Sequence, residues 1–183
     1  MIEIIARVCV AITVDDDGDP LLTMEVPMSV HPPMPTSEEL LHSHSDLTRL
    51  VEELETHARA LRTAESDETA DLLDDITRYA RKFDTSVRQH IAEEEDELFP
   101  RCRPHLDVKG RMKLERIREQ HRELEQVLDK LFDYLHAAHA ADELDTDLAE
   151  AVYVRARLLR YTFDLHSGEE RGFFEQMLEG RDE

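Results

Sequence analysis

The sequence predicts an all-α fold, an up-down-up-down four-helix bundle that carries a short N-terminal β-hairpin. Four long segments have apolar residues at alternating intervals of three and four, the spacing of the seams between packed helices. The composition is also typical of helices, with 36% charged residues, 5% aromatic residues, five glycines and no tryptophan. Short connections between the segments favour antiparallel neighbours, which gives the up-down-up-down order.

The N-terminal region is expected to form a separate element, with residues 1–35 as a β-ribbon and proline-rich linker and 36–180 as the bundle. Residues 4–14 and 21–30 are rich in the β-branched side chains of strands, and the aspartates of 15–20 predict a turn. The turn resembles a calcium loop, but it has no Glu at the twelfth position and Gly18 is misplaced, so a solvated turn is the better interpretation. An isolated hairpin is marginal in water, so this ribbon would pack on the bundle or pair with a second copy in a homodimer.

The helix boundaries follow from start and stop signals. The sequence Thr36-Ser37-Glu38-Glu39 has capping-box spacing, and Glu65-Ser66-Asp67 offers a cap for the second helix. Pro100 and Pro104 would end that helix, and Asp107 can cap the third. We therefore expect helices over residues 37–63, 68–99, 108–138 and 146–178.

Charge and targeting signals limit the class of protein. A formal net charge of -21 argues against nucleic-acid binding, because such surfaces are basic. No apolar run approaches the roughly 20 residues that cross a bilayer, and the start lacks a signal peptide, so we expect a cytoplasmic protein without a membrane partner. Cys9 and Cys102 form neither a CxxC motif nor a disulfide framework.

A histidine interrupts the apolar stripe of each predicted helix. These are His44 near the start of the first helix, His90 near the end of the second, His121 in the first half of the third and His166 in the second half of the fourth. In the predicted topology all four lie roughly 10–20 Å from the same end, at 1.5 Å per residue. They can therefore form one inward-facing layer.

Carboxylates accompany two of these histidines. Glu94 follows His90 by four residues and Glu170 follows His166 by four, so each pair shares a helix face. A lone core histidine is more often a packed, hydrogen-bonded residue, but four in one layer without a metal would cost ~1–3 kcal/mol for each unsatisfied group. Mixed imidazole and carboxylate ligands suit iron and manganese. A metal site is favoured over a metal-free structural bundle.

Further acidic residues are alternatives. Glu125, one turn from His121, is a candidate extra ligand; Glu169 competes with Glu170; and Glu97, one turn after Glu94, is a candidate supporting residue. The rest of the run Glu93–Glu97 is interpreted as a mainly solvated face. His42 should face solvent, because it lies about 200° around the helix from His44. The remaining histidines are expected away from the site: His31, His57, His105, His136 and His139.

In four strings the sequence resembles the hemerythrin-like (HHE cation-binding) family, over about residues 38–178. They are His44-Ser-Asp-Leu-Thr-Arg-Leu-Val, His90-Ile-Ala-Glu-Glu-Glu-Asp-Glu-Leu-Phe-Pro100, Glu119-Gln-His121-Arg-Glu-Leu and His166-Ser-Gly-Glu-Glu170. The resemblance implies two non-haem iron ions, with manganese or zinc as substitutes, and an oxo or hydroxo bridge. It implies Glu94 and Glu170 as bridging ligands, with the four histidines shared between the ions.

The chain departs from the oxygen carriers of this family. Glu125 stands where they have a second histidine on the third helix, and Arg171 where they have a bridging aspartate. The resemblance therefore implies sensing or handling of oxygen, peroxide, nitric oxide or iron, with a small diatomic molecule or peroxide as ligand. The alternatives are a peroxidase-like, catalase-like or nitric-oxide-reducing enzyme, and a metal-stabilised interaction module.

Overall fold

The computed structural model of the chain describes residues 9–14, 20–25 and 44–179, and the chain divides into two compact units, Met1–Pro33 and Met34–Glu183. In the first unit, strand β1 (Cys9–Val14) pairs antiparallel with β2 (Pro20–Glu25), from Cys9 opposite Glu25 to Val14 opposite Pro20. The predicted turn, the outer ends of the hairpin, the linker and the Thr36–Glu39 capping box lie outside the described residues. The hairpin as a whole therefore stays a prediction.

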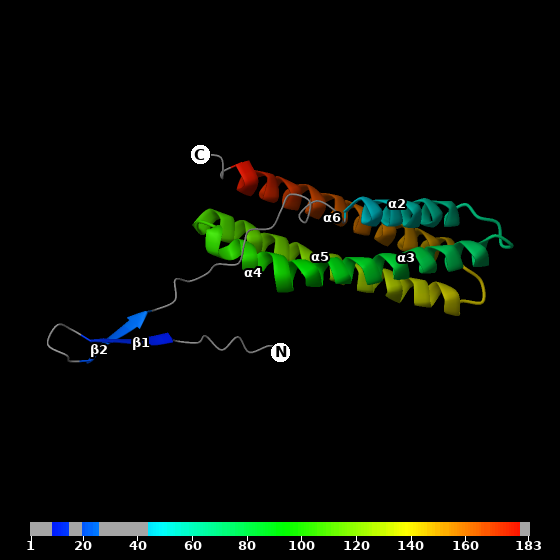
Figure 1. Ribbon diagram of the computed structural model, residues 1–183. Helices are drawn as coiled ribbons and strands as arrows, with labels where there is room; N and C mark the ends of the chain where they lie inside the picture. Colours follow the sequence, from blue (N-terminus) through cyan, green and yellow to red (C-terminus); the bar gives the residue numbers. More distant parts are fainter. Residues whose placement is uncertain (1–8, 15–19, 26–43, 180–183) are drawn as a thin grey trace. The chain divides into compact units, whose positions relative to one another are not determined.

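The second unit is an all-α four-helix bundle, as predicted. Its long helices are α2 (His44–Leu61), α3 (Thr69–Glu93), α5 (Val108–Ala140) and α6 (Thr146–Glu179). Helix α2 packs against α3 and α6, and α5 packs against the same two helices. The α2–α3 and α5–α6 connections lie at one end and α4 at the other, so successive helices alternate in direction (Figure 1). Among the described residues, no helix is both long and apolar enough to span a membrane.

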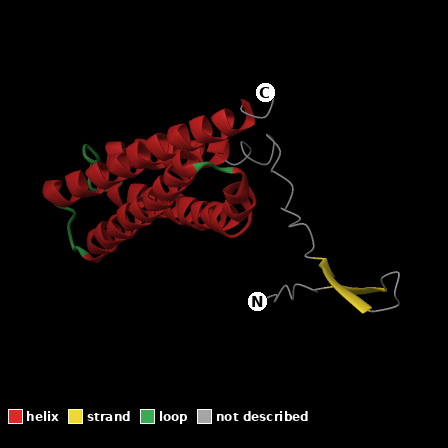
Figure 2. Ribbon diagram, turned by 90° about the vertical axis from the view of Figure 1, so that its left-hand side faces the viewer, coloured by secondary structure: helices red, strands yellow, loops and turns green. Residues whose placement is uncertain are grey.

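The apolar stripes form the core because their spacing turns one face of every helix inward. All four helices bury this face almost completely, and removing each large side chain from water contributes about 1.5–3 kcal/mol. The core includes Leu47, Val51, Leu54, Ile76, Phe83, Val87, Leu124, Leu128, Leu131, Val152, Leu159 and Phe163. Short loops connect the helices of this unit (Figure 2).

The predicted N-terminal cap is confirmed for α5 but not for α3. Asp107 Oδ1 accepts a hydrogen bond from the backbone N–H of Gly110 at 2.7 Å, so it caps α5 as predicted. The predicted cap of the second helix at Glu65–Asp67 is wrong, because α3 begins after Glu68 without a side-chain cap. Asp145 caps α6 in the same way as Asp107, accepting from the N–H of Leu148 at 2.7 Å.

The end of the second helix differs from the prediction. Pro100 does not close it, because α3 continues through a π-helical turn, η1 (Glu94–Leu98), into the short helix α4 (Phe99–Cys102) and the 3₁₀ turn η2 (Arg103–His105). The N–H of Phe99 reaches back five residues to the carbonyl of Glu94. Pro100 then occupies the first turn of a new helix, where a missing N–H is tolerated. The π turn changes which residues of 94–98 face inward.

A second, smaller apolar cluster closes the α4 end of the bundle. It contains Leu98, Phe99, Cys102, Leu114, Ile117, Phe173 and Phe174. Burial raises the pKa of the Cys102 thiol to about 11, so this free cysteine stays protonated and inert. Along α3, α5 and α6 the histidines stand between the residues of the main core and those of this cluster. The histidine layer is therefore enclosed by apolar side chains on both sides.

Candidate metal centre

The four histidines predicted to form a layer do meet in the bundle. Each comes from a different helix, and all are at most 6% exposed. Two overlapping groups of side chains could each hold a metal ion, with the ligand atoms of a group within 4.8 Å of one another. One group is His44, His90, His166 and Glu170, and the other is Glu94, His121 and His166.

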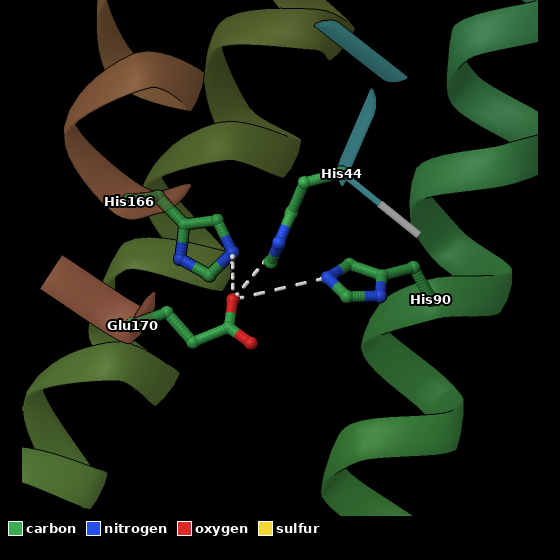
Figure 3. Close-up of side chains that lie close together, drawn as sticks. All are labelled: His44, His90, His166 and Glu170. Carbon is green, nitrogen blue, oxygen red and sulfur yellow. Dashed lines mark ion pairs between the residues drawn. The ribbon is translucent and has the colours of Figure 1, made fainter. Parts of the chain in front are cut away.

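Glu170 is the meeting point of three histidines from three helices. Its Oε2 atom lies 3.0 Å from Nε2 of His44, 3.2 Å from Nε2 of His166 and 3.9 Å from Nε2 of His90. Figure 3 shows the three imidazoles pointing toward this carboxylate. Glu170 is completely buried, so the structure favours it over its neighbour Glu169 for a place at this centre.

Glu94 contacts two histidines, His121 and again His90. Its Oε1 lies 3.1 Å from Nε2 of His90 on its own helix, and its Oε2 lies 3.1 Å from Nε2 of His121 on α5. The two oxygens of the Glu94 carboxylate thus contact histidines from two helices. Glu94 therefore lies between a histidine of α3 and a histidine of α5.

The imidazoles are grouped in two pairs. The ring centroids of His44 and His90 are 4.8 Å apart, and those of His121 and His166 are also 4.8 Å apart. Between the pairs, the His44–His166 and His90–His166 distances are 6.0 and 6.4 Å. Glu94 and Glu170 each contact one histidine or more of both pairs.

Many polar atoms of this centre have no hydrogen-bond partner among the described residues. They include Nε2 of His44 and His121, both ring nitrogens of His166, and both carboxylate oxygens of Glu170. An unsatisfied buried polar group costs about 1–3 kcal/mol, and a cluster of them in a native protein calls for a ligand. A donor set of four imidazoles and two carboxylates fits iron, manganese or zinc.

The pKa values of the two carboxylates shift in opposite directions when no cation lies between them. Burial, and then the charge of Glu170, raise the pKa of Glu94 well above its usual range. Burial alone would raise the pKa of Glu170 too, but the adjacent His166, His44 and His90 outweigh it and lower that pKa. Without a metal, burial and the charge of Glu170 therefore favour the protonated form of Glu94.

His121 is prepared to act as a neutral ligand. Burial, and then the proximity of His166, lower the pKa of His121 to about 4. Its imidazole is therefore neutral at physiological pH, which is the form that binds metals.

Three of the alternative residues lie outside this centre. The structure does not bring Glu125, the candidate extra ligand, to the centre, because its carboxylate accepts a hydrogen bond from Arg88 at 2.8 Å on the outside of the bundle. Glu169 is exposed and accepts from the amide of Gln120 at 2.7 Å. Glu97 is exposed as well. In an α-helix it would lie on the same face as Glu94, three residues earlier, but the π-helical turn has more residues per turn and moves Glu97 off that face.

Sequence reasoning missed a residue that does contact the centre. Glu95, interpreted as part of a solvated face, places Oε1 2.8 Å from Nδ1 of His121. The aromatic ring of Phe99 stacks on the same imidazole, with centroids 5.8 Å apart and planes 7° from parallel. The sequence signal for this contact was Pro100, because a proline lacks the backbone N–H and so interrupts the regular hydrogen bonds of the helix near Glu95.

The remaining histidines of the described part of the chain lie elsewhere. His57 contacts the backbone carbonyl of Glu53 and the carboxylate of Asp75. His139 contacts the hydroxyl of Thr77 at 3.0 Å, and His105 and His136 are exposed. His31 and His42 lie outside the described residues.

Comparison with known proteins agrees with the geometry. The family model of the hemerythrin HHE cation-binding domain matches residues 35–152, more than half of the chain and including His44, His90, Glu94 and His121. Neither the comparison with curated proteins nor that with solved structures gives a match. The matched region and the buried histidine and glutamate cluster lead to one conclusion: the chain belongs to the hemerythrin HHE cation-binding domain family.

Proposed function

We propose that this protein is a non-haem di-iron protein that senses or handles oxygen, peroxide, nitric oxide or iron. The observation that carries the proposal is the division of four buried imidazoles into two close pairs, His44 with His90 and His121 with His166. Two carboxylates, Glu94 and Glu170, extend between the pairs.

The pairing supports two ions rather than one. A single ion would draw all its ligands around one point, whereas here the two rings of each pair are nearer to each other than to the measured rings of the other pair. Two-metal sites hold their ions roughly 3.5–4 Å apart, a separation that one carboxylate spans with its two oxygens. We assign Glu94 and Glu170 as the bridging ligands, with two histidines for each ion.

The nature of the ligands supports iron. Imidazole with carboxylate suits iron, and manganese or zinc are alternatives for the same donor set. When bound, two irons supply redox chemistry and a coordination position for a small diatomic molecule or peroxide. Glu125 and Arg171 stand where the oxygen carriers have a second histidine and a bridging aspartate, and both lie on the outside of the bundle. A centre with four imidazoles favours sensing or stress chemistry over reversible oxygen carriage.

The chain's own residues set the conditions at this centre. The apolar clusters that contain Phe163 on one side and Phe99 on the other exclude water from the imidazoles. A cation held between the carboxylates would favour the ionised form of Glu94 and so oppose its raised pKa. Exclusion of water strengthens every electrostatic interaction of the ligands with the cations.

The test is the metal content and reactivity of the purified protein. We expect about two irons per chain and ligand-to-iron charge-transfer absorption in the near ultraviolet. Mixing the reduced protein with oxygen or nitric oxide should change that absorption once, without turnover. Steady consumption of peroxide would instead favour the enzymatic alternative. A colourless, metal-free protein whose melting temperature does not change when a chelator is added would contradict both.

The setting of the protein is also a proposal. We propose a cytoplasmic protein without a membrane partner, and the strongly acidic composition supports the absence of a nucleic-acid partner. Because an isolated hairpin is marginal in water, we also propose that the ribbon of residues 1–35 contacts a second copy. Sedimentation of the full chain and of a form that lacks residues 1–35 tests the dimer, which only the full chain should form.

A further inference from the structure

Glu95 holds the outer edge of the His121 imidazole. Its Oε1 is 2.8 Å from Nδ1, while Nε2 on the opposite edge of the ring faces Glu94 Oε2 at 3.1 Å. An ionised carboxylate only accepts hydrogen bonds, so Nδ1 must donate. This selects the tautomer that leaves the lone pair of Nε2 free on the inward side.

The π turn explains how two successive glutamates reach one ring. Glu94 is buried, whereas the side chain of Glu95 is 32% exposed, so the first lies inside and the second at the rim. Successive residues of a helix diverge by about 100°, which places these carboxylates on different sides of His121. The ring is thus contacted at both nitrogens by η1 (Glu94–Leu98).

The surrounding side chains restrict the ring further. Phe99 stacks on the face of His121 at 5.8 Å, and the guanidinium of Arg118 lies 5.7 Å from the centroid of the Phe99 ring. Arg118 Nε is also 4.0 Å from the second oxygen of Glu95. By contrast, Nδ1 of His166 has no hydrogen-bond partner among the described residues. The contact at Nδ1 thus distinguishes His121 from His166, the other member of its ring pair.

We propose that Glu95 is a positioning residue, which orients His121 and selects the tautomer whose Nε2 faces the metal centre. This inference rests on the proposed metal centre. Groups that orient a metal-binding histidine typically change metal affinity 10–100-fold when they are removed. Glu95 has the distance, the acceptor chemistry and the supporting contacts for that role.

The experiment compares Glu95→Ala, Glu95→Gln and the matched control Glu97→Ala in the full chain. Co²⁺ is titrated into each metal-free protein against a competing chelator, and its visible absorption reports the ligand geometry. Imidazole ¹⁵N shifts of the metal-free proteins report the tautomer of His121, and thermal melting reports the fold. Should Glu95→Ala fail to fold, the near-isosteric Glu95→Met carries the same comparison.

We expect Glu95→Ala to lose about 10–100-fold in Co²⁺ affinity, with an altered spectrum and a mixture of His121 tautomers. Glu97→Ala should match the wild type, and Glu95→Gln should keep most of the affinity because its amide oxygen still accepts. Equal affinities and spectra for Glu95→Ala and Glu97→Ala would overturn the inference and leave the metal centre standing. So would equal losses for Glu95→Gln and Glu95→Ala. A wild type that binds no Co²⁺ would instead overturn the metal centre, and with it the role of Glu95.

Discussion

The Nε2 atom of His44, the first residue of α2, lies 3.0 Å from Oε2 of Glu170, near the end of α6. The contact joins the first and last helices of the bundle at the metal centre (Figure 3). The match to the hemerythrin domain ends at residue 152, before the two residues of α6 that lie at this centre. The structure therefore adds His166 and Glu170 to the histidines that the family match includes.

Substitution of Glu170 tests its place in the centre. Glu170→Gln replaces a fully buried anionic side chain by a neutral amide, so metal affinity should fall by at least the roughly 10–100-fold that follows loss of a group that only supports a ligand. Glu169→Gln is the matched control, because the neighbouring carboxylate is exposed and should leave the metal content unchanged. The metal content of both purified variants shows which of the two glutamates binds the metal. Loss of metal from Glu169→Gln alone would show that the neighbouring residue is the ligand.

The proton held by Glu94 predicts a stability effect that reverses with metal. Since its pKa is raised, chiefly by burial and then by Glu170, the folded protein binds more protons than the unfolded one. In the metal-free protein, the contribution of Glu94 to stability is therefore fully present below about pH 4.3, the unfolded value, and is lost as pH rises above it. Glu94→Gln cannot ionise, so near pH 7 without metal it should be more stable than the wild type, and this difference should shrink as pH falls toward about 4.3. Denaturation in chelator at several pH values measures this difference. A less stable Glu94→Gln under those conditions would contradict the assignment.

The convergence of the histidines was predictable because it depends on local properties of the chain. The interval of three and four residues gives each helix an inward face, and the helix lengths give the height of each histidine. Helices α5 and α6 begin at 108 and 146 as predicted, and Asp107 caps α5. Family resemblance then named the two glutamates. The fold and the histidine layer thus follow from periodicity and caps.

The outer contacts of the centre were not predictable, because they depend on tertiary partners and on an irregular turn. Glu125 lies one turn from His121, but Arg88 on α3 holds its carboxylate outside, and nothing local to α5 indicates that partner. Glu95 and Glu97 exchanged their expected roles because a π turn replaces the α-helical period between Glu94 and Leu98. Regular periodicity cannot foresee such a turn.

Phe163 tests whether the core supports the centre. Its ring is fully buried, with its centroid 6.1 Å from that of His44 and 5.4 Å from that of Phe83. Phe163→Ala should cost about 3–5 kcal/mol of unfolding free energy and weaken metal binding, because the cavity loosens the imidazoles. Leu131→Ala, about 15 Å from His121 along α5, should cost about 2–5 kcal/mol and keep the metal. Denaturation and metal titration of both variants measure these effects; unchanged metal affinity in Phe163→Ala would refute the supporting role.

Glu55 predicts an acid dependence that is separate from the metal. Burial tends to raise its pKa, but hydrogen bonds from Arg160 at 2.9 Å and Arg59 at 2.7 Å lower it. A lowered folded pKa gives stability that is present above about pH 4.3 and is lost as pH falls through the folded value. Glu55→Gln should cost about 1 kcal/mol at neutral pH, since both guanidinium groups are partly exposed, and less in acid. The exposed Glu52→Gln is the control, with almost no expected change. A cost for Glu55→Gln that stays constant into acid would contradict the assigned pKa.

The most direct test of the central claim is anomalous diffraction at the iron edge from crystals of the protein purified without chelators. The account predicts two peaks, roughly 3.5–4 Å apart, one beside His44 and His90 and the other beside His121 and His166. Both peaks should lie within bonding distance of Glu94 and Glu170. A single peak, or none in a folded protein supplied with iron, would contradict it.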